Sequence, residues 1–283
     1  MIRLATRQFS LKTTPETCMN SNPSDSVADY LAFAHELADA AGAAVLPHFR
    51  KKSAIDNKLE GGFDPVTEAD RAAEREMRKL IEARYPDHGI VGEEFPRKEG
   101  VSTLEWILDP VDGTRSFVFG MTTWTTLIGL LDDGTPLAGM MNQPYVGERF
   151  YGSSDGAFWQ RGSESERLSV KPAGDLASAL ISTTAPALYK TEREAQFLQR
   201  MIKASRSIRY DADAYFFCLL AAGHIDVALD AGLQSYDIAP LVPIIEAAGG
   251  IVTTWDGEPA TAGGNIIAAA SRQLYEEALS LLP

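Results

Sequence analysis

Cysteine is scarce in this 283-residue chain, which has only Cys18 and Cys218, far apart and in unlike contexts. Two such residues exclude a disulfide framework and a cysteine-based zinc cluster, and a reducing cytoplasm suits them best. Positive charge is also low, since 26 lysines and arginines face 39 aspartates and glutamates, for a formal net charge of -13. Nucleic acids and anionic membranes attract clustered lysine and arginine, so neither is expected as a partner.

Long hydrophobic runs are missing as well, and none approaches the ~20 apolar residues that span a bilayer. The composition, 45% hydrophobic and 23% charged, is that of a globular protein. A chain of this length buries a large core as one large domain or two closely joined ones. We therefore expect a cytoplasmic protein that does not enter membranes.

The chain divides into a leader and two folded parts. Residues 1–25 are rich in Arg, Ser and Thr and have no acid before Glu16, which resembles an organellar transit peptide. A flexible leader, or a true start near Met19, explains them more simply, because chain termini are ordinarily disordered. A polar, turn-rich stretch predicts the junction between residues 26–165, an α+β part, and residues 166–283, an α/β part.

Hydrophobic periodicity predicts the helices and strands of both parts. In the first part we expect amphipathic helices at residues 26–49 and 67–85, then an antiparallel meander of strands at residues 124–131, 136–144 and 148–162. In the second part the pattern predicts strands at residues 179–186, 225–230, 251–255 and 265–270, and helices at residues 191–205, 214–223 and 238–250. Sheets covered by layers of helices follow.

The segment EWILDPVDGTRSF, residues 105–117, places two aspartates three residues apart at the end of an apolar run. Asp109-Pro110 ends the run, and Asp112-Gly113 turns the chain toward a new helix. Two carboxylates this close repel one another, so either a cation lies between them or the turn is fully solvated.

Each further acid has an ordinary explanation when it is taken alone. Asp70 supports a helix N-terminus, Glu93-Glu94 is a solvated charge pair, Asp112-Gly113 is a common turn and Asp237 is a helix N-cap. The set points elsewhere, because Glu93, Asp109 and Asp112 all lie where apolar strands end. Strand ends that meet helix N-termini are where α/β proteins bind ligands.

Oxygen-only ligands of this kind select a hard cation such as Mg²⁺. Asp109 and Asp112 are placed to bridge two ions ~3.5–4 Å apart, the spacing of two-metal phosphoryl transfer. Gly113 and Thr114, at the start of the predicted helix, would offer backbone N–H groups to phosphate oxygens. The pattern therefore favours metal-dependent chemistry on a phosphate ester.

Four motifs, DPVTEAD, VGEE, WILDPVDGT and YDIAPLVPIIEAAGG, together resemble the inositol monophosphatase family of Mg²⁺-dependent, lithium-sensitive phosphatases. They occur in the family's order across residues 26–283. The resemblance implies a layered α-β-α-β-α sandwich of the α/β (α+β) class, two or three Mg²⁺ ions per site and a homodimer. It also implies that residues 26–165 are the metal-binding part and that residues 166–283 complete the active site.

The same resemblance assigns roles to individual residues. It implies metal ligands at Glu93, Asp109, the main-chain carbonyl of Val111, Asp112 and Asp237. Asp70 and Thr114 match the family's positions around the nucleophilic water, which Glu93 would help to orient and activate. Gly113 and Thr114 would cradle the phosphate, and Glu94 is a neighbour without an assigned role.

Within the family, the second half of the chain is most similar to the histidinol-phosphatase branch. Asp213 follows a small residue, Ala212, and Tyr236-Asp237 stands where other members have Trp-Asp. Two features depart from that branch, which usually has Gly before the first acid and Glu where this chain has Asp230. The resemblance implies that Asp112, Asp213 and Asp230 contact the substrate.

We therefore expect a Mg²⁺-dependent phosphomonoesterase that uses metal-activated water to hydrolyse histidinol phosphate, a small-molecule phosphate monoester, to histidinol and phosphate in histidine biosynthesis. Asp213 and Asp230 would favour the ammonium and imidazole of histidinol over a neutral polyol. The ordinary alternative makes them a helix-start residue and a strand-end turn residue. An inositol-1-monophosphatase, or a broader sugar or nucleotide phosphatase, is the enzymatic alternative. A regulatory binding partner of the transcription or ribosome-assembly machinery is the non-enzymatic one.

Overall fold

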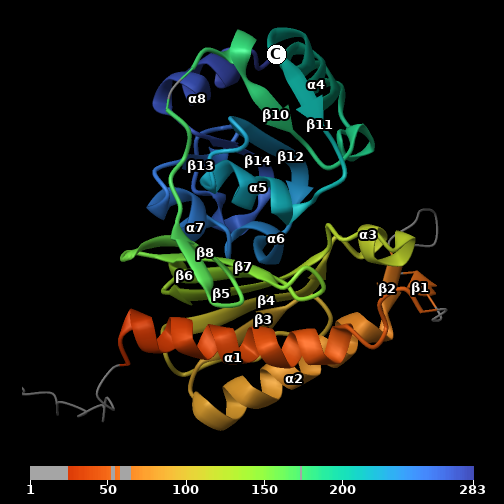
Figure 1. Ribbon diagram of the computed structural model, residues 1–283, viewed down its shortest axis with the longest axis vertical. Coiled ribbons are helices and arrows are strands. Elements are labelled where there is room, and N and C mark those ends of the chain that lie inside the picture. Colours follow the sequence, from red (N-terminus) through yellow and green to blue (C-terminus); the bar gives the residue numbers. More distant parts are fainter. Residues whose placement is uncertain (1–24, 52–54, 58–64, 173) are drawn as a thin grey trace, which may run out of the picture.

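The computed structural model describes residues 25–51, 55–57, 65–172 and 174–283. The predicted leader, apart from its last residue, and Cys18 lie outside the described residues. Figure 1 shows five stacked layers that alternate helices and sheets. The predicted α-β-α-β-α sandwich is confirmed. Among the helices of the described ranges, none combines the length and the apolar character needed to cross a membrane.

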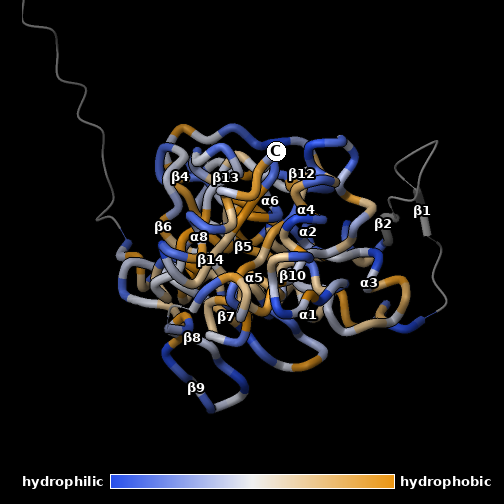
Figure 2. Tube along the Cα trace, turned by 90° about the horizontal axis from the view of Figure 1, so that it is seen from above, coloured by the Kyte–Doolittle hydropathy of each residue, from blue (hydrophilic) through white to orange (hydrophobic). Residues whose placement is uncertain are grey.

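A seven-stranded sheet forms the second layer, with strand order β3-β4-β5-β6-β7-β8-β9. Its strands are β3 Gly89–Gly92, β4 Leu104–Asp112, β5 Thr125–Asp132, β6 Thr135–Gln143, β7 Glu148–Ser153, β8 Gly156–Arg161 and β9 Glu164–Arg167. β3 is parallel to β4 and every later pair is antiparallel, so the predicted meander is confirmed. The predicted boundary between residues 165 and 166 falls inside β9. The hydrophilic β9 lies at the rim of the molecule in Figure 2, where apolar segments gather inside.

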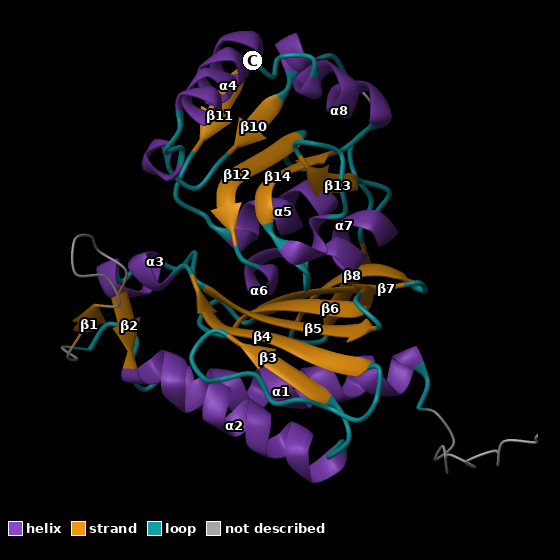
Figure 3. Ribbon diagram, turned by 180° about the vertical axis from the view of Figure 1, so that it is seen from behind, coloured by secondary structure: helices purple, strands orange, loops and turns teal. Residues whose placement is uncertain are grey.

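Two long helices, α1 Val27–Val45 and α2 Glu68–Arg84, cover one face of this sheet (Figure 3). Ser26 begins α1 with a capping box, because its hydroxyl accepts from the Asp29 N–H and the Asp29 carboxylate accepts from the Ser26 N–H. The helix ends four residues before the predicted Phe49, since Pro47 has no N–H to continue it. α2 starts at Glu68 and ends at Arg84, each within one residue of the predicted bounds.

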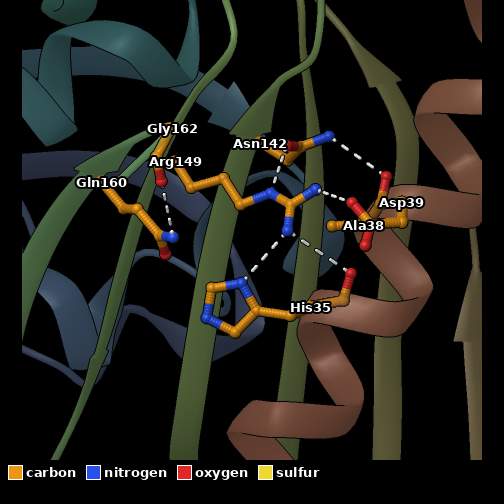
Figure 4. Close-up of polar contacts among 7 residues, drawn as sticks. All are labelled: His35, Ala38, Asp39, Asn142, Arg149, Gln160 and Gly162. Carbon is orange, nitrogen blue, oxygen red and sulfur yellow. Dashed lines mark hydrogen bonds and ion pairs between the residues drawn. The ribbon is translucent and has the colours of Figure 1, made fainter. Parts of the chain in front are cut away.

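A polar network ties α1 to the sheet (Figure 4). Arg149 of β7 donates from Nε to Asn142 Oδ1 at 2.7 Å, forms an ion pair with Asp39 and lies 3.1 Å from His35 Nδ1. Asn142 Nδ2 in turn donates to the Ala38 carbonyl at 3.3 Å. His35 is therefore a structural residue that helps to hold Arg149 against α1.

A five-stranded sheet, with order β11-β10-β12-β14-β13, forms the fourth layer. Its strands are β10 Leu180–Ser182, β11 Ser207–Arg209, β12 Val227–Leu233, β13 Ile251–Thr254 and β14 Gly264–Ala269. β10 is parallel to both β11 and β12, and β14 is antiparallel to β12 and β13. The shorter elements β1 Ile55–Asn57 and β2 Pro65–Thr67 pair with each other beside α3 Thr114–Phe119.

Helices fill the space between the sheets and cover the outer face of the second one (Figure 3). The central layer holds α5 Ala214–Ala221, α6 Ser235–Ile238 and α7 Val242–Ala247, and the outer layer holds α4 Glu192–Ala204 and α8 Arg272–Leu279. One buried apolar cluster joins the central helices to strands of both sheets. The 3-10 turns are η1 Leu176–Ser178, η2 Pro186–Leu188 and η3 Ala260–Ala262.

Proline explains two differences from the predicted elements. The helix predicted over residues 238–250 is two helices, α6 and α7, because Pro240 between them lacks an N–H and Pro243 suits the first turn of a new helix. The strand predicted over residues 179–186 is only three residues long, and Pro186 begins a 3-10 turn. The break between α6 and α7 lets α6 approach the first sheet, where it contacts β4 and β5.

Candidate active site

The two aspartates of the segment EWILDPVDGTRSF lie at a bulge in β4, the strand next to the edge strand β3. The strand does not end at Asp109, as the sequence suggests, but continues through Pro110 to Asp112. Asp109 pairs with Leu127 and Asp112 with Thr125, so two residues of β4 lie opposite one of β5. The bulge accommodates Pro110, which has no N–H for a regular ladder. It brings both carboxylates to one side of the strand end.

Asp237 reaches the same place from α6. One carboxylate oxygen each of Asp109, Asp112 and Asp237 lie within 4.8 Å of one another. Backbone N–H groups hold all three side chains. The Val111 N–H donates to Asp109 at 3.0 Å, the Ala214 N–H to Asp112 at 2.9 Å and the Gln234 N–H to Asp237 at 2.7 Å. The predicted acids from two distant segments therefore meet at one point.

A cavity of about 400 Å³ opens over this cluster between the two sheets. Glu93, in the loop after β3, lines it together with the three aspartates. The remaining predicted residues on its wall are Val111, Gly113, Thr114, Asp213 and Asp230. Asp70 lies beneath the wall, in contact with Thr114. The structure thus gathers the predicted site residues in and around one cavity.

The electrostatics of the cluster favour a bound cation. Burial, followed by the charges of Glu93 and Asp112, raises the pKa of Asp109, whose side chain is only 2% exposed. Burial and the charges of Asp213 and Asp237 raise the pKa of Asp112, against the Ala214 N–H that donates to it at 2.9 Å. Several carboxylates that destabilise one another and offer only oxygen ligands fit a hard divalent ion such as Mg²⁺.

These shifts predict a pH-dependent effect of metal on stability. An acid whose pKa is raised by folding stabilises the metal-free fold, and this contribution is complete below the pKa of the unfolded chain, near 4. The contribution is lost as the pH rises through the pKa of the folded protein, which is about 7 for Asp213. If the cluster holds Mg²⁺, the ion would bind the ionised acids and offset that loss. The Tm difference between Mg²⁺ and chelator, measured by calorimetry, should therefore be several degrees larger at pH 8 than at pH 5.5. An equal Tm difference at both pH values would contradict this prediction.

Thr114, the first residue of α3, lies beside the cluster with its hydroxyl near two acceptors. Its Oγ1 is 3.0 Å from the Val111 carbonyl and 3.3 Å from Asp70 Oδ1. Asp70 is fully buried in the first turn of α2. Because the hydroxyl donates its one proton to either of these acceptors, its oxygen can still accept a hydrogen bond from a water molecule.

Asp213 stands opposite Thr114, at the N-cap of α5. It has no side-chain capping bond and instead accepts from Ser116 Oγ at 3.2 Å. A Cβ atom on Gly113 would lie 2.7 Å from its carboxylate, so the glycine permits this close approach. Burial, and then the charge of Asp230, raises the pKa of Asp213 to about 7.

Asp230 lies inside β12, so the alternative of a strand-end turn is wrong. Its side chain is 2% exposed and is held by three bonds, from Thr183 Oγ1, the Thr184 N–H and Thr184 Oγ1, each 2.7 Å long. Burial raises its pKa, while these donors lower it. The buried carboxylate is thus fixed in one orientation at the cavity wall.

Several lining residues were missed by sequence reasoning. The cavity wall also includes Arg115, Thr184 and Lys190. Two of them could have been predicted as site residues, because Arg115 directly follows the Gly113-Thr114 pair and Thr184 follows a short strand. Nothing in the sequence around Lys190 indicates a site residue, because a single lysine before a helix is common on protein surfaces.

The layered fold and its buried acidic cluster define a class of protein, the metal-dependent phosphatases. Residues 26–283 match the sequence model of the inositol monophosphatase family, and the chain belongs to that family. It is 35% identical to a chloroplastic bifunctional phosphatase of Arabidopsis thaliana, over 93% of this chain and 78% of the relative. It is 32% identical to a histidinol-phosphatase of Mycobacterium tuberculosis, over 90% and 98%. The structure of an inositol monophosphatase from Zymomonas mobilis superposes with a TM-score of 0.80 at 38% identity, over 91% and 99%.

Proposed function

We propose that the protein hydrolyses histidinol phosphate to histidinol and phosphate in a Mg²⁺-dependent reaction of histidine biosynthesis. The observation that carries the proposal is the presence of two further acids, Asp213 and Asp230, on the wall of the cavity that holds the carboxylate cluster. A substrate with a cationic leaving group would satisfy them, whereas a neutral polyol would leave them without charge partners. The similarity to a histidinol-phosphatase supports the same substrate.

The acidic cluster would hold the metal. The proposed ligands are the side chains of Glu93, Asp109, Asp112 and Asp237 and the main-chain carbonyl of Val111, for two or three Mg²⁺ ions. When bound, Mg²⁺ would supply Lewis-acid stabilisation of the phosphoryl oxygens and lower the pKa of water.

Residues of the chain would place the nucleophile and the phosphate. Thr114 and Asp70 hold the attacking water in line and take up its proton, with Glu93 on the other side. The backbone N–H groups of Gly113 and Thr114 bind the phosphate oxygens. The water oxygen forms the new bond to phosphorus, the ester bond breaks, and the leaving alkoxide takes a proton from solvent.

A nucleophilic side chain is not needed for this reaction. Cys218, the one cysteine among the described residues, is fully buried in α5, and burial raises its pKa well above the usual value. A thiol of that kind does not form a thiolate at neutral pH. This supports direct attack by water.

The alternative is an inositol-1-monophosphatase or a broader sugar or nucleotide phosphatase, which the similarity to the Zymomonas mobilis enzyme supports.

We further propose that the enzyme acts in the cytoplasm as a homodimer. Phe119, the last residue of α3, is 77% exposed, and Met121 just after the helix is exposed as well, so this apolar surface is suited to association.

The test is phosphate release from a panel of phosphate monoesters. We expect hydrolysis of histidinol phosphate in Mg²⁺, with a higher kcat/KM than for inositol 1-phosphate, fructose 1,6-bisphosphate or adenosine 3′,5′-bisphosphate. Excess chelator should abolish the activity, and added Mg²⁺ should restore it. A highest kcat/KM for inositol 1-phosphate would select the alternative, and no hydrolysis of any ester would reject both.

A further inference from the structure

Helix α2 carries a second buried acid one turn after Asp70. Glu74 is 0% exposed and has no part in the proposed chemistry. Residues four apart lie on the same face of a helix, so both acids face the first sheet. Asp70 reaches Thr114 on one side of the site. Glu74 reaches the loop after β3, on the other side.

Hydrogen bonds attach that loop to the helix at two points. Glu74 Oε2 accepts from the Glu94 N–H at 2.7 Å. Its other oxygen accepts from Arg78 Nε at 2.7 Å, and the same guanidinium donates to the Phe95 carbonyl at 3.1 Å. The backbone on the C-terminal side of Glu93 is therefore held by one buried ion pair.

Gly92, on the N-terminal side of Glu93, lies close against the carboxylate of Glu74. A Cβ atom at position 92 would lie 2.0 Å from Glu74 Oε1 and 2.4 Å from its carboxyl carbon. Real side chains do not approach so closely, so the loop comes this near to Glu74 only because residue 92 is glycine. The two residues flanking Glu93 thus both contact Glu74.

We propose that Glu74 is a positioning residue, which fixes the Gly92–Glu94 backbone so that the Glu93 carboxylate faces Asp109 across the metal site. This inference rests on the proposed function, in which Glu93 is a metal ligand. The physical reason is that removal of this carboxylate would leave Arg78 and the Glu94 N–H without their buried acceptor, so the loop would lose its attachment to α2.

The expected effect is on metal affinity. Glu74→Ala should raise the Mg²⁺ concentration for half-maximal activity about tenfold, as losses of residues that orient metal ligands do. Activity at saturating Mg²⁺ should stay within about threefold of wild type, because the ligands themselves remain. Calorimetric titration of substrate-free protein with Mg²⁺ should show the same loss of affinity. Glu74→Gln should lie between wild type and Glu74→Ala, because the amide oxygen still accepts from the Glu94 N–H while the amide NH2 group cannot accept from Arg78 Nε.

Met77→Ala is the matched control, because Met77 is also fully buried on α2 but packs in the apolar core. It should lower the Tm without changing Mg²⁺ affinity. Gly92→Ala should weaken Mg²⁺ binding as Glu74→Ala does, and the double variant should bind no worse than Glu74→Ala, since the clash partner is gone. If folded Glu74→Ala binds Mg²⁺ with wild-type affinity, the positioning role of Glu74 is overturned but the proposed function is not. Absence of Mg²⁺ binding in the wild type would overturn the proposed function as well.

Discussion

Replacing Asp109 by asparagine is expected to lower kcat/KM at least about a thousandfold, or ~4 kcal/mol of transition-state stabilisation, in a protein that stays folded. The amide keeps the shape of the carboxylate and can still accept from the Val111 N–H, so the bulge of β4 is preserved. What is lost is the negative charge at the centre of the proposed metal site. The loss is therefore chemical rather than structural.

The same substitution should stabilise the metal-free protein. Burial and neighbouring acids raise the pKa of Asp109, so its ionised form opposes folding at neutral pH. The asparagine side chain cannot ionise, and in chelator the variant should have a higher Tm than the wild type. Loss of activity together with a gain in Tm is a combination that ordinary misfolding does not produce.

Phosphate release and calorimetry, each with Mg²⁺ and with chelator, measure both effects. Asp132→Asn is a suitable control, because Asp132 is exposed at the opposite end of the β4–β5 pair, facing Leu104. It removes the same charge and should change neither quantity appreciably. Near-normal hydrolysis by folded Asp109→Asn would show that the cluster is not the metal site.

Parts of this site were predictable because they are local in the sequence. Asp109, Asp112 and Thr114 lie within six residues, and a close pair of acids followed by glycine indicates either a bound cation or a solvated turn without any knowledge of the fold. Asp237 is more than a hundred residues away, and its place in the cluster was assigned only through family resemblance. The structure brings it there because Pro240 ends α6 and directs it toward β4.

Other parts were not predictable, because their meaning depends on burial. Glu74 sits in a helix rich in charged residues, where an acid is ordinarily a solvated surface residue. Asp230 was open to interpretation as a turn residue, and only strand pairing places it inside β12 with its three donors. The bulge in β4 was also missed, since an Asp-Pro pair usually ends a strand. In each case the deciding contact comes from a distant segment.

In the proposed mechanism the metal site and the Gly113–Thr114 backbone contact only the phosphate, so the residues that contact the leaving group would select the substrate. We expect the ratio of kcat/KM for histidinol phosphate to that for inositol 1-phosphate to fall when Asp213 is replaced by asparagine. Loss of one charge-assisted hydrogen bond costs ~1–3 kcal/mol, which is roughly a 5- to 150-fold change in the ratio. Most of the loss should fall on histidinol phosphate, because inositol carries no cation to pair with the carboxylate.

Asp230→Asn should lower the same ratio by a smaller factor. Its oxygen can still accept from the two donors that bind Oδ1, Thr183 Oγ1 and the Thr184 N–H, so the fold is preserved while the charge is lost. Asp211→Asn provides the control. Asp211 is exposed, lies two residues before Asp213 and does not line the cavity, so its substitution removes an equal charge from outside the cavity. Although the charge of Asp211 also acts on Asp213, the ratio should change much less in that variant than in Asp213→Asn, which separates a direct contact from a general field effect.

Steady-state kinetics of the wild type and the three variants with both substrates measure the ratio directly. A wild-type ratio below one would reassign the enzyme to inositol phosphates. If the ratio favours histidinol phosphate but neither Asp213→Asn nor Asp230→Asn changes it, discrimination lies in other residues of the cavity wall. An equal fall in Asp211→Asn and Asp213→Asn would mean that the acidic surface attracts the cationic substrate without contacting it, and raising the salt concentration would then erase the preference.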